Sequence, residues 1–158
     1  WRGAQRASQL LPAWMSDVLT TRDPDEALRA ACRTLVDSGD YQAAWAVRCA
    51  SGSTHFLGPV ARRGQWRGCP PDLAPPRANG ERRPRLFSRV VTAGEALVAR
   101  DLGSTALLAL KNGELVVGIL AIRATDPDGF GETELRLLSP LSGSLGRRLS
   151  ELAGTVPR

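Results

Sequence analysis

Three cysteines and one histidine are the side chains of this chain best suited to covalent or metal chemistry. They are Cys32, Cys49, Cys69 and His55, and no CxxC or HxxxH spacing occurs. An odd number of cysteines without such spacing supports neither a disulfide framework nor a zinc site, so we expect a reducing, cytoplasmic setting. No Ser-His-Asp set and no pair of acid/base carboxylates stands out either. The sequence therefore predicts no catalytic residues, no metal site and no enzyme.

One thiol has a neighbour that favours reactivity. A cysteine reacts when its thiolate is accessible and stabilised by a nearby cation. Cys69 follows Arg67 closely, whereas Cys32 falls on the apolar face of a predicted helix, where a thiol behaves as a small hydrophobic group. A redox enzyme or thiol sensor that uses Cys69 or Cys49 is therefore the third of three hypotheses for the function.

The positive charge of the chain comes almost entirely from arginine. The net charge is +5 and Lys111 is the only lysine. Seven arginines fall within residues 62–85, a stretch broken by prolines that holds one aromatic residue, Trp66. Nucleic-acid binding needs a basic face on an ordered element, ideally with aromatic residues for stacking. We therefore expect a flexible Arg/Pro/Gly-rich loop at 62–85 and no nucleic-acid partner. No apolar run has transmembrane length, so no membrane partner is expected.

Two helices are predicted before residue 40. The first covers residues 5–19, and Pro12 either starts its regular part or kinks it. The second begins where Asp23 can cap it, Pro24 suits its first position and Glu26 completes a capping box. We read residues 1–22 as an N-terminal helical connector. Because the sequence starts without a methionine, we expect it to be a piece of a longer protein.

Five apolar runs predict strands. In the first, Trp45 and its alternate neighbours are large, whereas Ala44 and Ala46 are small, which predicts a close helix on the small side. Asn112-Gly113 lies between the last two runs and predicts a hairpin, because both residues tolerate the positive φ of a type I′ turn. Gly118 lies in the middle of the last run and predicts a bulge or a close neighbour. The expected strands are residues 43–49, 54–61, 97–101, 106–110 and 115–122, with a short helix at 86–93.

The last helix is expected to open at Gly131 and to run to a short tail at 154–158. Phe130 and Leu135 fit a hydrophobic staple, Glu134 fits a capping box, and Pro140 should bend the helix. Leucines at alternating three-four spacing are typical of a coiled-coil seam, and with the first helix they predict pairing across a two-fold axis. The residues expected on this dimer and relay surface are Leu11, Met15, Val18, Leu138, Leu145, Leu149 and Leu152.

The order of these elements, with their particular residues, resembles a GAF domain over nearly the whole chain. The residues that carry the resemblance are 31–36 with Gly39, Tyr41 and 44–45; 93–95 with Val98 and 100–102; 113–120; and Asp128, Phe130, Glu134 and 137–138.

The resemblance implies an α+β fold at residues 23–153, with a central antiparallel sheet. N- and C-terminal helices would pack on one face of the sheet, and a loop and short helix would lie over the other. It also implies a regulatory sensory module of a bacterial, cytoplasmic signal-transduction protein, including two-component systems. Such a module senses a small ligand or state and relays it through its terminal helices. The output domain implied is a kinase, a cyclic-dinucleotide enzyme or a transcription regulator.

The resemblance places a small-molecule pocket on the loop-covered face, in members that have one. Our candidates for its lining are Trp66, Arg85, Phe87 and Val91. His55 adjoins a hairpin turn and is expected at the surface, so it makes a poor haem ligand. The Asn-Lys-Phe-Asp-Glu signature of cyclic-nucleotide binders is absent. The ligand and any cofactor therefore stay unknown.

Two departures from the family support an alternative. The connection after Asp101 is short, so most of a segment that helps to roof the pocket is missing. Ala109 stands where the family commonly has proline. The pocket is then either roofed by the 62–84 loop and the 86–93 helix or collapsed. A ligand-free, degenerate GAF domain that acts as a dimerisation scaffold is therefore the second hypothesis.

Overall fold

The computed structural model describes residues 2–39, 41–50, 53–61, 97–99, 104–113, 115–124 and 130–154. The predicted short helix at 86–93, the loop at 62–85 and residues 155–158 lie outside this part of the chain. The helical elements are α1 (Arg2–Ala13), the π-helix η1 (Trp14–Val18), α2 (Pro24–Asp37) and α4 (Glu132–Gly154). The strands are β1 (Ala43–Ala50), β2 (Ser53–Ala61), β3 (Leu97–Ala99), β4 (Ser104–Asn112) and β5 (Leu115–Ala124).

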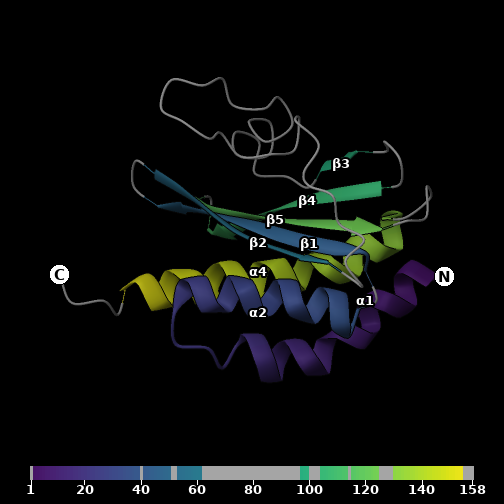
Figure 1. Cartoon of the computed structure of the whole chain (residues 1–158), viewed down its shortest axis with the longest axis horizontal. Helices are drawn as coiled ribbons and strands as arrows, with labels where there is room; N and C mark the ends of the chain where they lie inside the picture. Colours follow the sequence, from purple (N-terminus) through teal and green to yellow (C-terminus); the bar gives the residue numbers. More distant parts are fainter. Residues whose placement is uncertain are drawn as a thin grey trace.

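The strands form one antiparallel sheet in the order β2-β1-β5-β4-β3. All the described helices lie on one face of it (Figure 1). Helices α2 and α4 lie next to the strands, and α1 with η1 lies on their outer side. This arrangement confirms the predicted α+β fold with terminal helices on one face of an antiparallel sheet.

Helix α2 begins as the sequence predicts. Asp23 has an extended backbone, and its side chain accepts a hydrogen bond from the backbone N–H of Glu26 at 3.1 Å. This bond satisfies one of the N–H groups that have no partner within the helix. At the other end, a Cβ at Gly39 would lie 2.7 Å from Leu10 Cδ2 and 2.7 Å from the carbonyl oxygen of Leu35. Glycine therefore lets α1 approach the end of α2.

Strand β1 separates small from large side chains, as predicted. Ala44 and Ala46 lie in the core between the sheet and the helices, whereas Trp45 and Val47 are buried on the second face of the sheet. A Cβ at Gly118 of β5 would lie 2.8 Å from the Val47 carbonyl oxygen. The predicted close approach at Gly118 is therefore confirmed.

The turn between β4 and β5 differs from the prediction. Asn112 is the last residue of β4 and pairs with Leu115 of β5, so the turn begins after it, at Gly113. Gly113 has φ +65°, but Asn112 does not have a positive φ. The predicted hairpin is confirmed, because β4 and β5 pair antiparallel around this turn, but the type I′ turn centred on Asn112-Gly113 is wrong. The reason is that pairing continues to the end of β4, with Lys111 opposite Val116 and Asn112 opposite Leu115, so Asn112 belongs to the strand.

Helix α4 runs unbroken through Pro140 from Glu132 to Gly154. Its start is capped by Glu134, whose Oε1 accepts a hydrogen bond from the backbone N–H of Phe130 at 2.7 Å. Phe130 has φ +64°, and it is the only non-glycine residue of the described chain with a positive φ. A side chain normally disfavours this conformation, so packing and the Glu134 contact must hold it.

Candidate functional site at the contact between the terminal helices

The structure divides the residues expected on a dimer and relay surface into two sets. Leu11 and Met15 on the N-terminal segment are 52% and 57% exposed. The others are buried in the chain's own core: Val18, Leu138, Leu145, Leu149 and Leu152. The buried leucines of α4 therefore pack against the chain's own sheet and helices, because α4 closes one side of the core. Of the residues expected on this surface, Leu11 and Met15 are the two that remain exposed to a second copy.

The N-terminal segment does not present Leu11, Met15 and Val18 on one surface, as the prediction of a relay surface required. Leu10, Trp14 and Val18 are buried, whereas Leu11 and Met15, one residue further along, are exposed. The reason is the π-helix η1, in which the backbone N–H of Leu19 donates to the Trp14 carbonyl at 3.3 Å, five residues back. The extra residue held in this turn changes the register of α1 relative to Val18, so that Leu10 and not Leu11 shares the buried face with Val18.

Two polar contacts join the N-terminal segment to α4. The indole Nε1–H of Trp14 donates to Ser144 Oγ at 3.2 Å. Further along, Arg148 Nη2 donates to the Thr21 carbonyl oxygen at 2.8 Å. Apolar packing alone tolerates sliding, whereas directional hydrogen bonds at two points fix one register between the segments.

A third contact joins the start of α4 to the corner between α2 and β1. Tyr41 Oη donates to Glu134 Oε2 at 2.6 Å, and the Tyr41 ring stacks on Phe130 with centroids 5.7 Å apart. All three residues are buried. The sequence analysis had assigned Glu134 to helix capping, and it missed the bond to Tyr41, because the partners are 93 residues apart.

Helix α4 also rests directly on the backbone of β4. A Cβ at Gly146 would meet the backbone of Lys111, with its nitrogen only 2.6 Å away. Glycine is therefore required for this approach. Sequence analysis missed Gly146, although glycine inside a long helical pattern is a signal of close packing. A displacement of β4 would push on α4 at this point.

The second face of the sheet is the face where the resemblance places a pocket. Trp45, Val47, Leu107 and Ile119 are buried there. The four expected lining residues, Trp66, Arg85, Phe87 and Val91, lie outside the described residues. On the same face, Arg123 Nη1 donates to Thr105 Oγ1 at 3.2 Å, so a polar pair lies beside the buried apolar residues described there.

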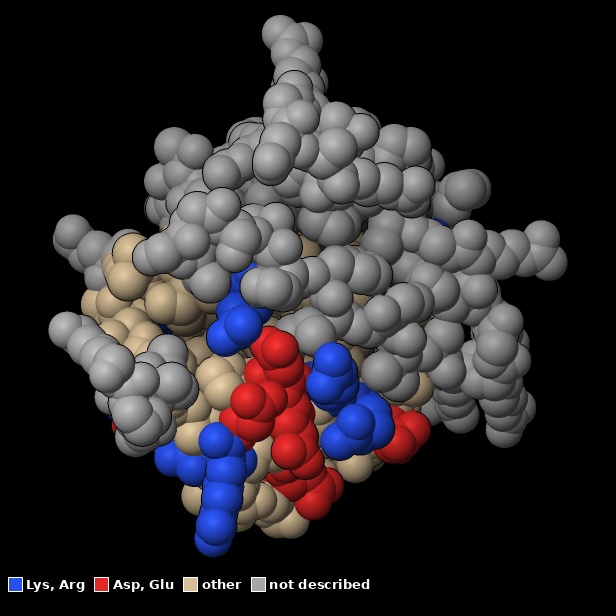
Figure 2. All heavy atoms as spheres, turned by 60° about the vertical axis from the view of Figure 1, so that its left-hand side comes forward, with Lys and Arg blue, Asp and Glu red and all other residues tan. Residues whose placement is uncertain are grey.

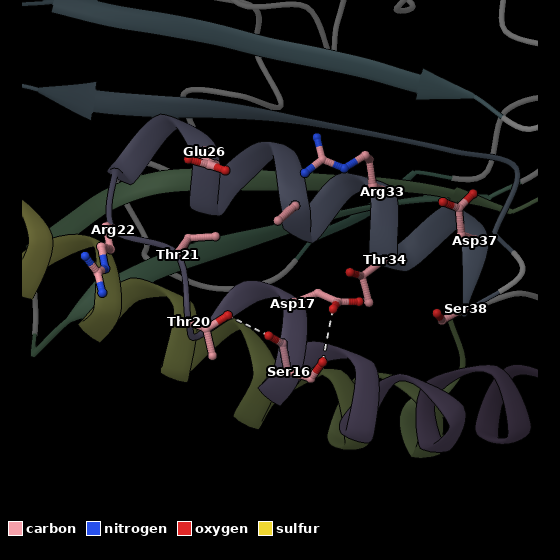
Figure 3. Close-up of a pocket in the computed structure, with 11 residues that line it drawn as sticks. Ser16, Asp17, Thr20, Thr21, Arg22, Glu26, Arg33, Thr34, Asp37 and Ser38 are labelled. Carbon is pink, nitrogen blue, oxygen red and sulfur yellow. Dashed lines mark hydrogen bonds between the residues drawn. The ribbon is translucent and has the colours of Figure 1, made fainter.

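A groove of about 610 Å³ lies elsewhere, between η1 and α2. Figure 3 shows Ser16 and Asp17 of η1 opposite Thr34 of α2. Ser16 Oγ donates to Asp17 Oδ1 at 3.0 Å, and Thr20 Oγ1 donates to the Ser16 carbonyl at 2.6 Å. The lining is polar and carries charges of both signs. This groove therefore differs in position and chemistry from a pocket on the second face of the sheet.

Charges of both signs also meet on the surface near the start of α2. Arg48 Nε of β1 lies 2.9 Å from Asp25 Oδ1 of α2. Figure 2 shows acidic side chains gathered between basic ones on this side of the molecule. The described surface in that view therefore carries no large area of positive charge alone.

Cys32 is not equipped for nucleophilic chemistry. Burial raises the pKa of its thiol to about 12, with the charge of Arg33 opposing this in part. A thiol with such a pKa stays protonated near neutral pH. The side chains of Cys49 and His55 and all of Cys69 lie outside the description. Within the described residues, no group of three His, Cys, Asp or Glu side chains could hold a metal ion, and no helix is long and apolar enough to cross a membrane.

Known structures share this fold over almost their full length. The GAF domain of a phosphoenolpyruvate-protein phosphotransferase from Coxiella burnetii matches with 16% identity, a TM-score of 0.72 and 96% of each chain covered. The free methionine-R-sulfoxide reductase from Neisseria meningitidis also has 16% identity and a TM-score of 0.72, over 97% of this chain and 93% of that one. The GAF domain of the potassium sensor histidine kinase KdpD from Escherichia coli has 12% identity and a TM-score of 0.64, over 93% and 95%.

Identities this low show a common fold and leave the activity open. Comparison with curated proteins finds no match. The family model for the GAF domain, however, matches residues 21–150. Since that match covers most of the sequence, and the sheet and helices agree with solved GAF domains, this chain belongs to the GAF domain family.

Proposed function

We propose that this GAF domain is a regulatory sensory module of a bacterial signal-transduction protein. It senses a small ligand or state in the cytoplasm and relays it through its terminal helices to an output domain in the same polypeptide. The output domain is a kinase, a cyclic-dinucleotide enzyme or a transcription regulator. The presence of similar folds in a sensor histidine kinase and in a phosphotransferase protein supports a signalling role.

One observation carries the proposal: α4 packs on the sheet, and the N-terminal segment is joined to α4 by directional contacts. Helix α4 rests on the β4 backbone at Gly146, and the Trp14–Ser144 and Arg148–Thr21 bonds tie it to the N-terminal segment. A ligand that displaced β4 from the second face would therefore move α4, and with it the N-terminal segment. Both ends of the domain would receive the same signal.

The test is native mass spectrometry of the freshly purified domain, followed by thermal-shift screening with nucleotides, haem and metabolites. A sensor module should either carry a reproducible extra mass or gain melting temperature in proportion to the logarithm of ligand concentration. A domain that carries no adduct, and whose melting temperature does not change with any compound at saturating concentration, would support the scaffold alternative.

The scaffold alternative, a ligand-free degenerate GAF domain that only dimerises, is supported by the exposure of Leu11 and Met15. Two large apolar side chains one helical turn apart are costly to leave in water, and a partner copy would bury them. The scaffold predicts a dimer whose melting temperature does not respond to small molecules.

A thiol-dependent activity is the third candidate, supported by the similarity to free methionine-R-sulfoxide reductases. With Cys32 protonated and buried, such an activity would have to use Cys49 or Cys69. Thiol-dependent reduction of free methionine sulfoxide that survives Cys69→Ala and Cys49→Ala singly and together would remove this candidate.

A further inference from the structure

The N-terminal segment carries two interleaved apolar sets, each spaced by four residues and offset by one. The first set is Leu10, Trp14 and Val18, and all three are buried. The second set is Leu11, Met15 and Leu19, of which Leu11 and Met15 are mostly exposed and Leu19 is half-buried. With Val18 buried in both cases, either Leu10 and Trp14 or Leu11 and Met15 could cover the same core, so the sequence supplies two candidate registers for one helix.

The π-helix η1 lies where a change of register can be absorbed. A π-turn closes its hydrogen bond over five residues and an α-turn over four, so it holds one extra residue. Converting this turn to α-helix, with Val18 held in place, rotates the preceding helix by about 100°, the angle per residue. That rotation turns Leu10 outward and Leu11 inward, and brings Met15 toward the core.

We propose that η1 is a one-residue register switch. The structure describes the π state, with Leu10 and Trp14 buried, while the α state buries Leu11 and Met15 and turns α1 about its axis. The inference rests on the proposed relay through the terminal helices and adds the physical change that would be relayed. Its output is the face that α1 presents to whatever lies beside it.

Specific contacts hold the π state. The Trp14–Ser144 hydrogen bond would break on rotation of the helix. Leu10 occupies the space that glycine leaves at position 39, since a Cβ there would lie 2.7 Å from Leu10 Cδ2. Both contacts favour the first apolar set, which explains why it is the buried one.

Other terms oppose the π state. Leu11 and Met15 remain in water, although burying a side chain of this size stabilises a protein by about 1.5–3 kcal/mol. A π-turn is rare in proteins, and short π segments recur at functional sites. Two packings with such compensating terms form a bistable element, which is what a switch requires.

Met15 is the only methionine of the chain, so it provides a selective probe. Labelling with [¹³C-methyl]methionine gives one methyl group whose NMR signal reports the surroundings of Met15 alone. We expect a second resonance, or relaxation dispersion on the microsecond-to-millisecond scale, from an α state populated at about 1–10%. The exchange should not depend on protein concentration.

Three variants of the 158-residue chain make the test specific. Deletion of the exposed Ser16 removes the extra residue of the π-turn while keeping the first set buried, so the exchange should disappear. Ser16→Ala removes the hydroxyl but keeps the residue count, and is the matched control in which exchange should persist. Trp14→Phe removes the bond to Ser144 and should raise the minor population at least threefold.

Two outcomes overturn the switch. One is a Met15 methyl signal without exchange in both the original chain and Trp14→Phe. The other is exchange that grows with protein concentration, which would assign it to self-association through Leu11 and Met15. Neither outcome bears on whether the domain binds a small molecule, which the thermal-shift screen tests separately. Failure of the switch and failure of the sensor proposal are therefore distinguishable.

Discussion

Glu134 is a buried carboxylate whose two oxygens accept hydrogen bonds from distant parts of the chain. Oε1 binds the Phe130 backbone and Oε2 binds the Tyr41 hydroxyl. Buried carboxyl oxygens need hydrogen-bond donors, so the contact specifies one arrangement of the α2–β1 corner and the start of α4. It also helps to hold Phe130 at its positive φ.

Replacing Glu134 with Gln should destabilise the domain by about 1–3 kcal/mol, because an amide NH₂ then faces one of the two donors. Tyr41→Phe should cost a similar amount, and the double variant should cost less than the sum. Urea unfolding measures all three. Glu132→Gln is the control on the same helix, since the exposed Glu132–Arg136 pair contributes at most about 0.5 kcal/mol. Equal losses at Glu132 and Glu134 would contradict the role of the buried contact.

Cys32 makes stability depend on pH in the alkaline range. Burial raises its thiol pKa from 9.0 to about 12, so above pH 9 the unfolded chain loses this proton before the folded one does. Its stabilising effect is complete below pH 9 and is lost as the pH rises toward 12. Relative to Cys32→Ala, the original chain should lose roughly 1 kcal/mol between about pH 7 and about pH 10. Urea unfolding at both pH values tests this, and parallel pH profiles would contradict it.

At the scale of elements, the position of α4 depends on Gly146 and does not depend on Gly143. Gly146 faces the Lys111 backbone, whereas a Cβ at Gly143 would meet nothing within 4 Å. The two positions are three residues apart on the same helix, so they share any effect of helix propensity. The difference between them therefore isolates the contact between α4 and β4.

Gly146→Ala should destabilise the domain by about 1–3 kcal/mol, because the strand backbone cannot move aside as a flexible side chain would. Gly143→Ala should be neutral or stabilise by up to about 1 kcal/mol through helix propensity. Thermal or urea unfolding of both variants gives the comparison. Equal effects at the two positions would show that α4 does not need its close approach to β4.

The N-terminal helices show how tertiary contacts select between local options. Trp14 and Val18 both point inward because η1 inserts a wider turn, and Trp14 then reaches Ser144. Pro12, in the last turn of α1, cannot donate a backbone hydrogen bond, which loosens the helix just before this turn. The local sequence thus permits an irregular turn, and the Trp14–Ser144 contact with α4 stabilises it.

At the scale of the whole molecule, the sheet separates two surfaces. One is covered by helices that connect to both ends of the domain, and the other carries buried apolar residues such as Trp45 and Ile119. A GAF domain built this way can join an event on the second face to the helices on the first. The exposed Leu11 and Met15 are the described residues of the terminal helices best placed to carry it to a second copy.

If two copies pair through the terminal helices, Leu11→Ser with Met15→Ser should weaken the dimer at least tenfold, because their apolar surface is no longer buried. Sedimentation velocity over a range of concentrations measures the change. Leu115→Ser is the matched control, since Leu115 is 68% exposed at the β4–β5 hairpin. A monomer at every concentration, or a dimer unaffected by the double variant, would contradict pairing through Leu11 and Met15. The signal would then pass to flanking domains without this contact.

Much of the fold follows from patterns that act within a few residues of one another. Asp23 with Pro24 and Glu26 determines where α2 begins, because a cap needs only its own first turn. Alternation around Trp45 predicts both faces of β1, since strand side chains point to opposite sides. The resemblance carried by such segments was sufficient to identify the family, which the domain match at 21–150 confirms.

Tertiary structure alone decided which apolar residues face inward on the terminal helices. The spacing of Leu11, Met15 and the α4 leucines fits a coiled coil as well as a core, because both need the same helical period. Only the packing of α4 on the sheet buries Leu145, and only the π-turn exposes Leu11. The predicted centre of the turn at Asn112 was wrong for a related reason: strand register is set by pairing across the sheet, and that pairing includes Asn112. Contacts between residues far apart in sequence, as in Trp14–Ser144, leave no local signal to read.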